Sequence, residues 1–106
     1  MVWHVEYTHE AQLDLDGLDN SQRVLVLKAI RKVSGNPLPA SEGGYGKPLG
    51  NRKASRLAGY FKIKLLRIGI RVIYGLVRSG NIMRVIVVSV RSDDAVYKIA
   101  QKRIEK

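Results

Sequence analysis

The chain has 106 residues, 45% of them hydrophobic, which is enough for one small domain with one core and excludes a disordered chain. It contains no cysteine, which excludes disulfides and thiolate metal sites, and it has neither a signal-peptide pattern at its start nor an apolar stretch long enough to cross a bilayer. We therefore expect a cytoplasmic protein with no membrane partner. The net charge of +10 is concentrated in residues 52–106, which carry fourteen Lys and Arg against three Asp and Glu. This distribution favours a nucleic-acid partner, and a solvated basic surface or an acidic protein partner would also explain it.

The first third of the chain predicts one strand and two helices. Residues 3–7 alternate apolar and polar side chains, as a short strand does. Thr8 is typical of a helix N-cap and begins a first helix, and residues 19–21 cap a second helix with an apolar stripe along one side. Residues 34–37 end this helix, and the short link between the two helices predicts a helical hairpin.

Residues 34–50 predict a loop, because they hold five of the ten glycines and all three prolines. Within this segment, Gly43-Gly44-Tyr45-Gly46-Lys47 lacks the Ser or Thr that follows the lysine of a phosphate-binding loop. We therefore interpret it as a connection rather than a nucleotide site.

The next two segments predict paired strands. Residues 60–65 alternate apolar side chains with Lys62 and Lys64, and residues 71–77 are rich in β-branched and aromatic side chains. If a two-residue turn joins them, antiparallel pairing places Lys64 opposite Arg71 on one face, whereas a longer loop leaves the register open. Like charges opposed in this way destabilise a sheet, so we expect this face to bind an anionic partner that offsets their repulsion.

Residues 82–90 are strongly apolar and predict a central strand, between a turn at 78–81 and Arg91. Residues 92–94 cap a final helix that has basic residues at its other end. The order strand–helix–helix–strand–strand–strand–helix predicts a single α+β domain over residues 1–106, with a small antiparallel sheet and a C-terminal helix.

Metal and nucleophile chemistry finds little support in the sequence. The two histidines, His4 and His9, lie near the start, and no His, Asp or Glu cluster has the spacing of metal ligands or of a serine triad. Asp14, Asp16 and Asp19 have the positions of solvated residues and helix caps, so no carboxylate pair suggests acid–base work. We expect no cofactor, and the remaining candidates are basic.

The candidates for catalysis are Lys62, Lys64, Arg71, Arg91 and Tyr97. Such a set can assist attack of an RNA 2′-hydroxyl on its adjacent phosphate, which leaves a cyclic phosphate and a free 5′-hydroxyl. Arginines stabilise the pentavalent phosphate, and a lysine, whose unperturbed pKa is about 10.4, becomes a base only where neighbouring cations favour its neutral form. Tyr97 would act as base, as leaving-group acid or as a stacking platform. Solvated lysines and a tyrosine packed on the sheet would give the same pattern, so binding and catalysis both stay open.

These residues lie in segments that resemble the RelE toxin family of bacterial and archaeal toxin–antitoxin modules. The resemblance runs nearly end to end, and its motifs are Tyr60-Phe61-Lys62-Ile63-Lys64-Leu65, Gly69-Ile70-Arg71-Val72-Ile73-Tyr74, Val88-Ser89-Val90-Arg91 and Val96-Tyr97. It implies an RNase-like α+β fold, cleavage of mRNA in the ribosomal A site, and neutralisation by a cognate antitoxin.

The resemblance also implies a role for each candidate. Lys62 and Lys64 match the basic strand residues of the family, with Lys62 near the proton transfer. Arg71 matches the phosphate-stabilising arginine, Arg91 the arginine that follows the last strand, and Tyr97 the C-terminal tyrosine at the cut site.

Two positions depart from the family pattern. Ile70 stands where the family often has an aromatic residue, and the link from Val90 to Arg91 lacks the glycine and basic residue of some members. Further cations expected to contact RNA are Arg52, Lys53, Arg56, Arg67, Arg84 and Lys98.

Two other functions remain as alternatives. The related ParE toxins share the fold and inhibit DNA gyrase without cutting RNA, but they are not expected to retain the full set of Lys, Arg and Tyr residues. A basic nucleic-acid-binding module without catalysis is the third possibility.

Overall fold

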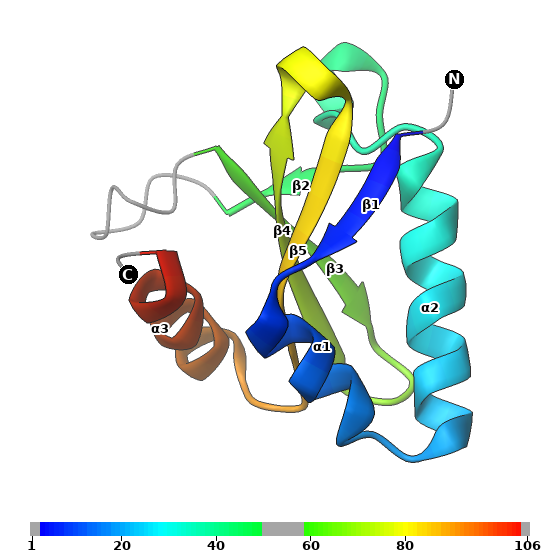
Figure 1. The fold of residues 1–106 in the computed structure, drawn as a ribbon, viewed down its shortest axis with the longest axis vertical. Coiled ribbons are helices and arrows are strands. Elements are labelled where there is room, and N and C mark those ends of the chain that lie inside the picture. Colours follow the sequence, from blue (N-terminus) through cyan, green and yellow to red (C-terminus); the bar gives the residue numbers. More distant parts are fainter. Residues whose placement is uncertain (1–2, 50–58, 105–106) are drawn as a thin grey trace.

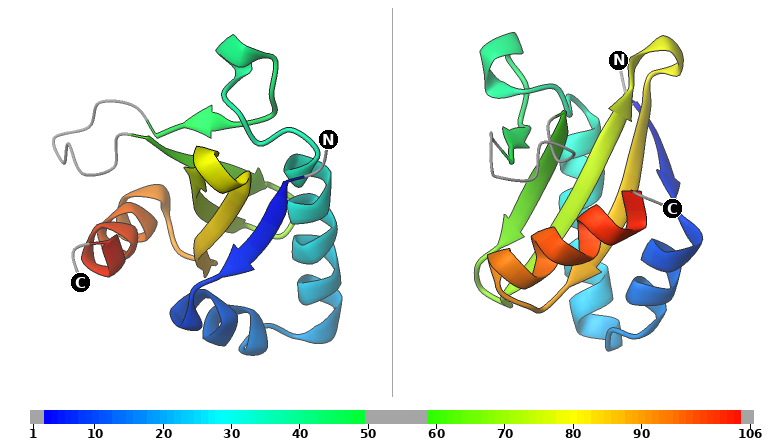
Figure 2. Two further views of the ribbon diagram at one scale, coloured as in Figure 1. Left: turned by 45° about the horizontal axis from the view of Figure 1, so that its top comes forward. Right: turned by 90° about the vertical axis from the view of Figure 1, so that its left-hand side faces the viewer.

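The sheet of this protein lies between two layers of helices. The computed structural model describes residues 3–49 and 59–104. Its strands are β1 (His4–Tyr7), β2 (Lys47–Pro48), β3 (Tyr60–Leu65), β4 (Ile70–Val77) and β5 (Ile82–Ser89). Its helices are α1 (His9–Asp16), α2 (Asn20–Ser34) and α3 (Asp93–Ile104), with short 3₁₀ turns η1 (Ala40–Glu42) and η3 (Arg78–Gly80). In the described ranges α1 and α2 cover one face of the sheet and α3 covers the other (Figures 1 and 2).

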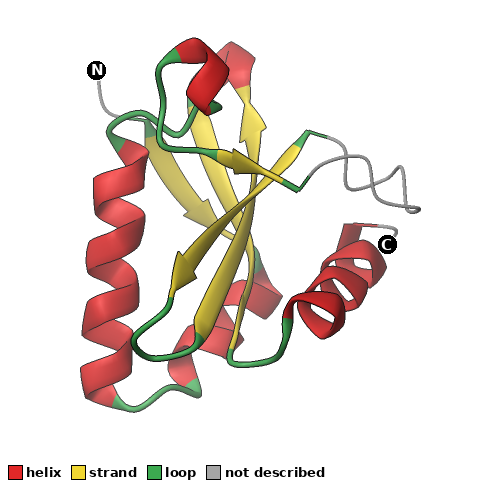
Figure 3. Ribbon diagram, turned by 180° about the vertical axis from the view of Figure 1, so that it is seen from behind, coloured by secondary structure: helices red, strands yellow, loops and turns green. Residues whose placement is uncertain are grey.

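The sheet is mixed rather than antiparallel, which corrects one part of the predicted α+β fold. The strand order is β1-β5-β4-β3-β2, and β1 runs parallel to β5 while the other pairs are antiparallel. The meander of β3, β4 and β5 leaves one edge of β5 open, and β1, which precedes both helices in the chain, pairs with this edge. Figure 3 shows the twisted sheet from behind, with α2 and α3 on either side of it.

A short strand also lies within the segment that was predicted to be a loop. Lys47 pairs with Lys62 and Pro48 pairs with Phe61, which makes β2 the edge strand beside β3. Proline has no N–H to donate, so an edge position is where a strand tolerates it.

The hairpin of β3 and β4 has the predicted register. Lys64 lies opposite Arg71, and Leu65 lies opposite Ile70. The connection is a loop of the residues between Leu65 and Ile70, and Gly69 takes a φ of +65° that side chains other than glycine rarely adopt. The longer loop therefore keeps the register that a two-residue turn would give.

The N-caps predicted for the first two helices are present. The hydroxyl of Thr8 accepts a hydrogen bond from the Ala11 N–H at 3.1 Å, and the carboxylate of Asp19 accepts one from the Gln22 N–H at 2.8 Å. This backbone N–H, and then the Ser21 hydroxyl, hold the pKa of the Asp19 carboxyl below its usual range. The caps fix where α1 and α2 begin. Both helices pack on the same face of the sheet.

Two apolar layers hold the helices on the sheet. Beneath α1 and α2, the buried residues include Tyr74 and Met83, whereas beneath α3 they include Ile73, Ile86 and Val87. Neighbouring residues of a regular strand face opposite sides, but a bulge in the pairing of β4 with β5 turns both Ile86 and Val87 toward α3. Because helices cover both faces of β5, its sequence is apolar without alternation. Within the described residues, no helix combines the length and apolar character needed to span a bilayer.

Candidate active site

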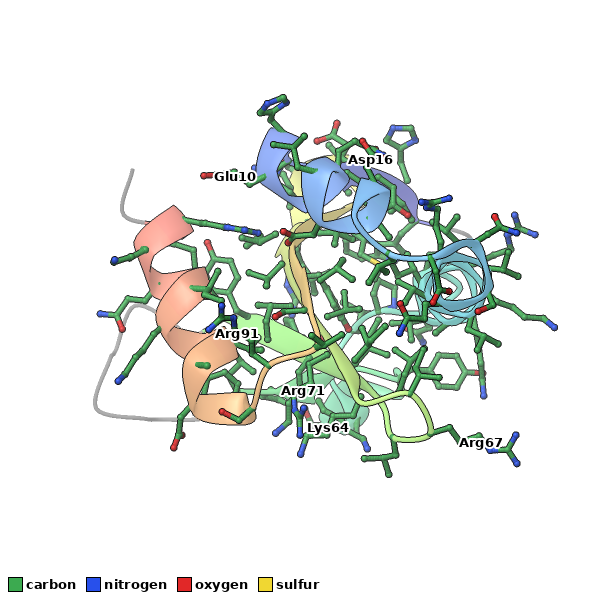
Figure 4. The ribbon with its side chains drawn as sticks, turned by 90° about the horizontal axis from the view of Figure 1, so that it is seen from below. Glu10, Asp16, Lys64, Arg67, Arg71 and Arg91 are labelled. Atoms are coloured by element: carbon green, nitrogen blue, oxygen red, sulfur yellow. The ribbon has the colours of Figure 1, made fainter. Side chains whose placement is uncertain are left out.

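The cations of β3 and β4 gather on the face of the sheet that α3 partly covers. Lys62 lies opposite Ile73, a residue of the apolar layer beneath α3, and Lys64 lies opposite Arg71. Opposed residues share a face, and residues two apart on a strand share it too. Lys62, Lys64 and Arg71 therefore face the same side, and Figure 4 shows Lys64 and Arg71 next to each other below the sheet.

Tyr97 joins this group from α3. Its side chain is 7% exposed, and its hydroxyl lies 3.0 Å from Nζ of Lys62, which donates a hydrogen bond to it. The same Nζ is 5.7 Å from the centre of the Tyr97 ring, so the ammonium lies beyond the hydroxyl rather than over the ring face. The contact is thus a polar one between a candidate proton donor and a candidate proton acceptor.

Arg91 is brought to the site through its backbone. Nη1 of Arg71 donates a hydrogen bond to the Arg91 carbonyl at 2.9 Å, and the Arg91 N–H donates to the Ser89 hydroxyl at 3.2 Å. These bonds hold the end of β5 beside Arg71, and the Arg91 side chain is exposed there. The structure thus places Lys62, Lys64, Arg71 and Tyr97 on one face, and it joins Arg91 to this group through its backbone carbonyl.

The predicted RNA contacts are more dispersed. Arg67 is exposed on the β3–β4 turn and points away from Lys64 and Arg71 (Figure 4). Arg84 lies on β5 and forms an ion pair with Glu6 at 3.4 Å. Lys98 is exposed on α3. The remaining three predicted contacts, Arg52, Lys53 and Arg56, lie outside the described residues.

The candidate site is an open face rather than an enclosed pocket. The cavity lined by Lys64 and Arg71 measures about 70 Å³, whereas cavities of about 160 and 180 Å³ lie elsewhere, beside Tyr60 and Arg84. An enclosed small-molecule site has several hundred Å³. An open face of clustered cations suits an extended polyanion, such as the backbone of a nucleic acid.

The side chains of this face belong to types that can bind a phosphate and exchange a proton. Among the described residues, no group of three or more His, Cys, Asp or Glu could hold a metal ion. Arginine presents a planar fork of N–H donors that matches phosphate oxygens. The lysine–phenol contact supplies groups that can exchange a proton with a hydroxyl at the reacting phosphate.

One side-chain contact between distant residues was not predicted from the sequence. Asp14, expected at a solvated or capping position, instead forms an ion pair with Arg103, with Oδ2 and Nη1 2.7 Å apart. The two residues are separated by 89 positions, and no local pattern connects them. The prediction for Asp14 was wrong because its partner comes from a helix on the other face of the sheet.

Comparisons with known proteins identify solved structures with a similar fold. No protein-family model matches the sequence, and no curated protein matches it significantly. The RelBE2 toxin–antitoxin complex of Mycobacterium tuberculosis contains a chain with 26% identity and a TM-score of 0.68, covering 88% of this chain and 95% of that one. A doubly substituted RelE toxin of E. coli in the free state has 24% identity and a TM-score of 0.75, covering 98% of this chain and 99% of that one. The ParDE toxin–antitoxin system of P. aeruginosa is less similar, with 14% identity and a TM-score of 0.50 over 83% of this chain and 95% of that one. The resemblance to the RelE family is thereby confirmed over nearly the whole chain.

Proposed function

We propose that this chain, which has the fold of the RelE toxins over nearly its whole length, is the toxin of a type II toxin–antitoxin module. One of the structures that it resembles is a toxin bound to its antitoxin, and this supports an antitoxin as its protein partner. The toxin would act in the cytoplasm, where ribosomes and mRNA are present, and its free form would arrest growth.

The proposed activity is cleavage of mRNA in the ribosomal A site. The 2′-oxygen of one nucleotide attacks the adjacent phosphorus, the bond to the 5′-oxygen of the next nucleotide breaks, and a 2′,3′-cyclic phosphate and a 5′-hydroxyl result. The observation that carries this proposal is the grouping of Lys62, Lys64 and Arg71 on one face, with the Tyr97 hydroxyl 3.0 Å from Lys62. Arg71 stabilises the charge of the pentavalent phosphate, and the Lys62–Tyr97 pair moves the protons.

The open shape of the face supports a role for the ribosome. Attack by the 2′-oxygen requires it to lie in line with the bond that breaks, and correct orientation supplies much of the rate of such reactions. The cavity beside Lys64 and Arg71 measures about 70 Å³, which is too small to enclose a nucleotide and impose this geometry on a flexible RNA. The ribosome holds the codon in its A site in a fixed conformation, so it would supply the alignment that the open face lacks.

The test is primer extension on an mRNA translated in a purified system, with and without this protein. The proposal predicts cuts inside codons positioned in the A site, and no cuts in the same mRNA without ribosomes. Inhibition of gyrase supercoiling, with intact mRNA, would instead assign the chain to the ParE function. Such an outcome would contradict the proposal, and the lower similarity to the ParDE structure makes it the less favoured one.

A double substitution separates catalysis from binding. Lys62→Ala with Arg71→Ala removes the candidate proton-transfer and phosphate-stabilising groups and leaves the other surface cations in place. We expect this variant to bind RNA and cut none. Equal cutting by the variant and the unaltered protein would contradict the assignment of the site.

The antitoxin contact should have a large electrostatic component. The basic second half of the chain predicts that an acidic or amphipathic segment of the antitoxin masks or distorts the basic face. Affinity should then fall as salt rises from about 0.1 to 1 M, because salt screens exposed charges. An affinity that does not change with salt would refute a mainly electrostatic contact.

A further inference from the structure

A bidentate ion pair joins two helices that lie on opposite faces of the sheet. Asp14 of α1 and Arg103 of α3 approach through two contacts, Oδ2 to Nη1 at 2.7 Å and Oδ1 to Nη2 at 3.2 Å. Their side chains are 19% and 18% exposed, so this ion pair is shielded from water and salt more than an ion pair on the surface is. We refer to Asp14 and Arg103 as the α1–α3 clasp.

The clasp also provides hydrogen-bond partners for the part of β5 that β1 does not reach. The pairing of β1 with β5 ends at Val85, whose carbonyl accepts a bond from the Thr8 N–H. Beyond this point Asp14 Oδ2 accepts a hydrogen bond from the Val88 N–H at 2.9 Å, and Arg103 Nη1 donates one to the Ile86 carbonyl at 2.8 Å. The clasp therefore satisfies two backbone groups of β5 and, in doing so, fixes the far end of α3 to the sheet.

Apolar packing alone would leave the orientation of α3 poorly defined. Val96 and Ala100 bury the inner side of this helix, but hydrophobic contact is not directional. The N-terminal end of α3 is held by the chain that leaves β5, and Arg103 provides an anchor near its other end. A planar guanidinium that engages a carboxylate and a carbonyl together has little rotational freedom.

We propose that Asp14 and Arg103 are positioning residues that hold α3 so that the Tyr97 hydroxyl meets Lys62. The catalytic consequence of this placement depends on the proposed nuclease function, but the placement itself does not. Loss of either clasp residue would let α3 turn or lift, and Tyr97 would move away from Lys62 while Lys64 and Arg71 stay on the sheet.

Tyrosine nitration by tetranitromethane tests the placement directly. Tyr97 is 7% exposed and should react slowly, while Tyr45, at 56%, serves as the reactive reference and Tyr74, at 0%, reports unfolding. In Arg103→Gln we expect nitration of Tyr97 to accelerate about tenfold, with the other two tyrosines unchanged. Lys102→Gln is the matched control, because it makes the same charge change at the neighbouring exposed position of α3 and should have no effect.

The other half of the clasp has its own control. Asp14→Asn should accelerate nitration of Tyr97 in the same way, whereas Asp16→Asn, on the exposed side of α1, should not. If Arg103→Gln exposes Tyr74, and so unfolds the chain, Arg103→Lys replaces it, because it retains the charge but loses the fork. Tyr97 reactivity no greater in the clasp variants than in their controls would overturn the proposal.

Cleavage assays then test the catalytic consequence. On programmed ribosomes, the clasp variants should cut about tenfold more slowly at saturating protein, with the concentration for half-maximal rate within about twofold. A released Tyr97 with an unchanged rate would overturn the positioning role in catalysis. If the unaltered protein cuts no mRNA, the proposed function fails, and the nitration result still decides whether the clasp places Tyr97.

Discussion

Replacing Tyr97 by phenylalanine removes one oxygen atom from the candidate site and leaves the ring in its place. The ring is 7% exposed and packs in the apolar layer beneath α3, so phenylalanine should keep this packing. The hydroxyl accepts a hydrogen bond from half-buried Lys62 at 3.0 Å. Its loss should cost no more than about 1 kcal/mol of stability, because the lysine ammonium can turn to water.

The effect on cleavage should be far larger than the effect on stability. A group that transfers a proton in the transition state contributes about 10²- to 10⁴-fold in rate. We therefore expect Tyr97→Phe to slow single-turnover cleavage on programmed ribosomes by about 10²-fold or more, and to change RNA affinity less than about twofold.

A second tyrosine provides the matched control for this prediction. Tyr74 is fully buried on the opposite face, and its hydroxyl donates a hydrogen bond to the Pro37 carbonyl at 2.9 Å. Tyr74→Phe should cost about 1 kcal/mol of stability in urea unfolding, since it leaves a buried carbonyl without its donor, and should not alter the cleavage rate. Cleavage by Tyr97→Phe at the unaltered rate, or equal slowing by both variants, would refute the proton-transfer role.

Three further predictions concern stability and the phosphate contact. Burial raises the pKa of the Tyr74 phenol, so the folded state keeps its proton at a pH near 10 where the unfolded state releases it. The free energy of unfolding should therefore fall above about pH 10. Urea unfolding of Tyr74→Phe should show a smaller fall. A Cβ at Gly75 would lie 2.7 Å from the Tyr60 ring, so Gly75→Ala should cost about 1 to 3 kcal/mol by the same assay, and unchanged stability would contradict this packing. Arg71→Lys keeps the charge but loses the guanidinium fork that donates to the Arg91 carbonyl, so cleavage should slow by about tenfold or more. The control Arg67→Lys, on the exposed turn, should cleave at the unaltered rate. Equal rates in the two variants would contradict the role of the fork.

The local part of the fold could be predicted from the sequence. Period-two alternation in residues 60–65 identified β3. The register that places Lys64 opposite Arg71 was predicted for a two-residue turn, and the longer loop of the structure keeps it. Thr8 and Asp19 marked the starts of two helices because a cap is a contact between residues close in sequence. Each of these predictions depends on neighbours in the chain.

Long-range pairings could not be predicted in the same way. The parallel contact of β1 with β5 depends on which edge of the sheet remains open after the meander has formed. The two-residue strand β2 has too few residues for a periodic pattern, and Pro48 argues against a strand except at an edge. The ion pair of Asp14 with Arg103 joins opposite ends of the chain, and neither residue differs in its local sequence from a solvated charge.

In the candidate site too, contacts between neighbouring strands could be predicted from the sequence, whereas contacts between distant elements could not. Strand alternation placed Lys62, Lys64 and Arg71 on one face without any knowledge of the family. The family resemblance implied a place for Tyr97 at the cut site but did not predict its contact with Lys62, because spacing alone does not tell which face of the sheet the last helix covers. Net charge could not separate Arg84, which pairs with Glu6, from the cations of the site.

In the proposed reaction, the face formed by Lys62, Arg71 and Tyr97 promotes attack of a 2′-hydroxyl of the mRNA on the adjacent phosphate. The most direct test is an mRNA that carries one 2′-deoxynucleotide at the position cut in the A site, compared with the all-ribose mRNA on programmed ribosomes. We expect the deoxy substitution to abolish this cut, and the all-ribose mRNA to yield a cyclic phosphate and a 5′-hydroxyl. Cleavage of the deoxy mRNA at the same position and rate would contradict the proposed reaction.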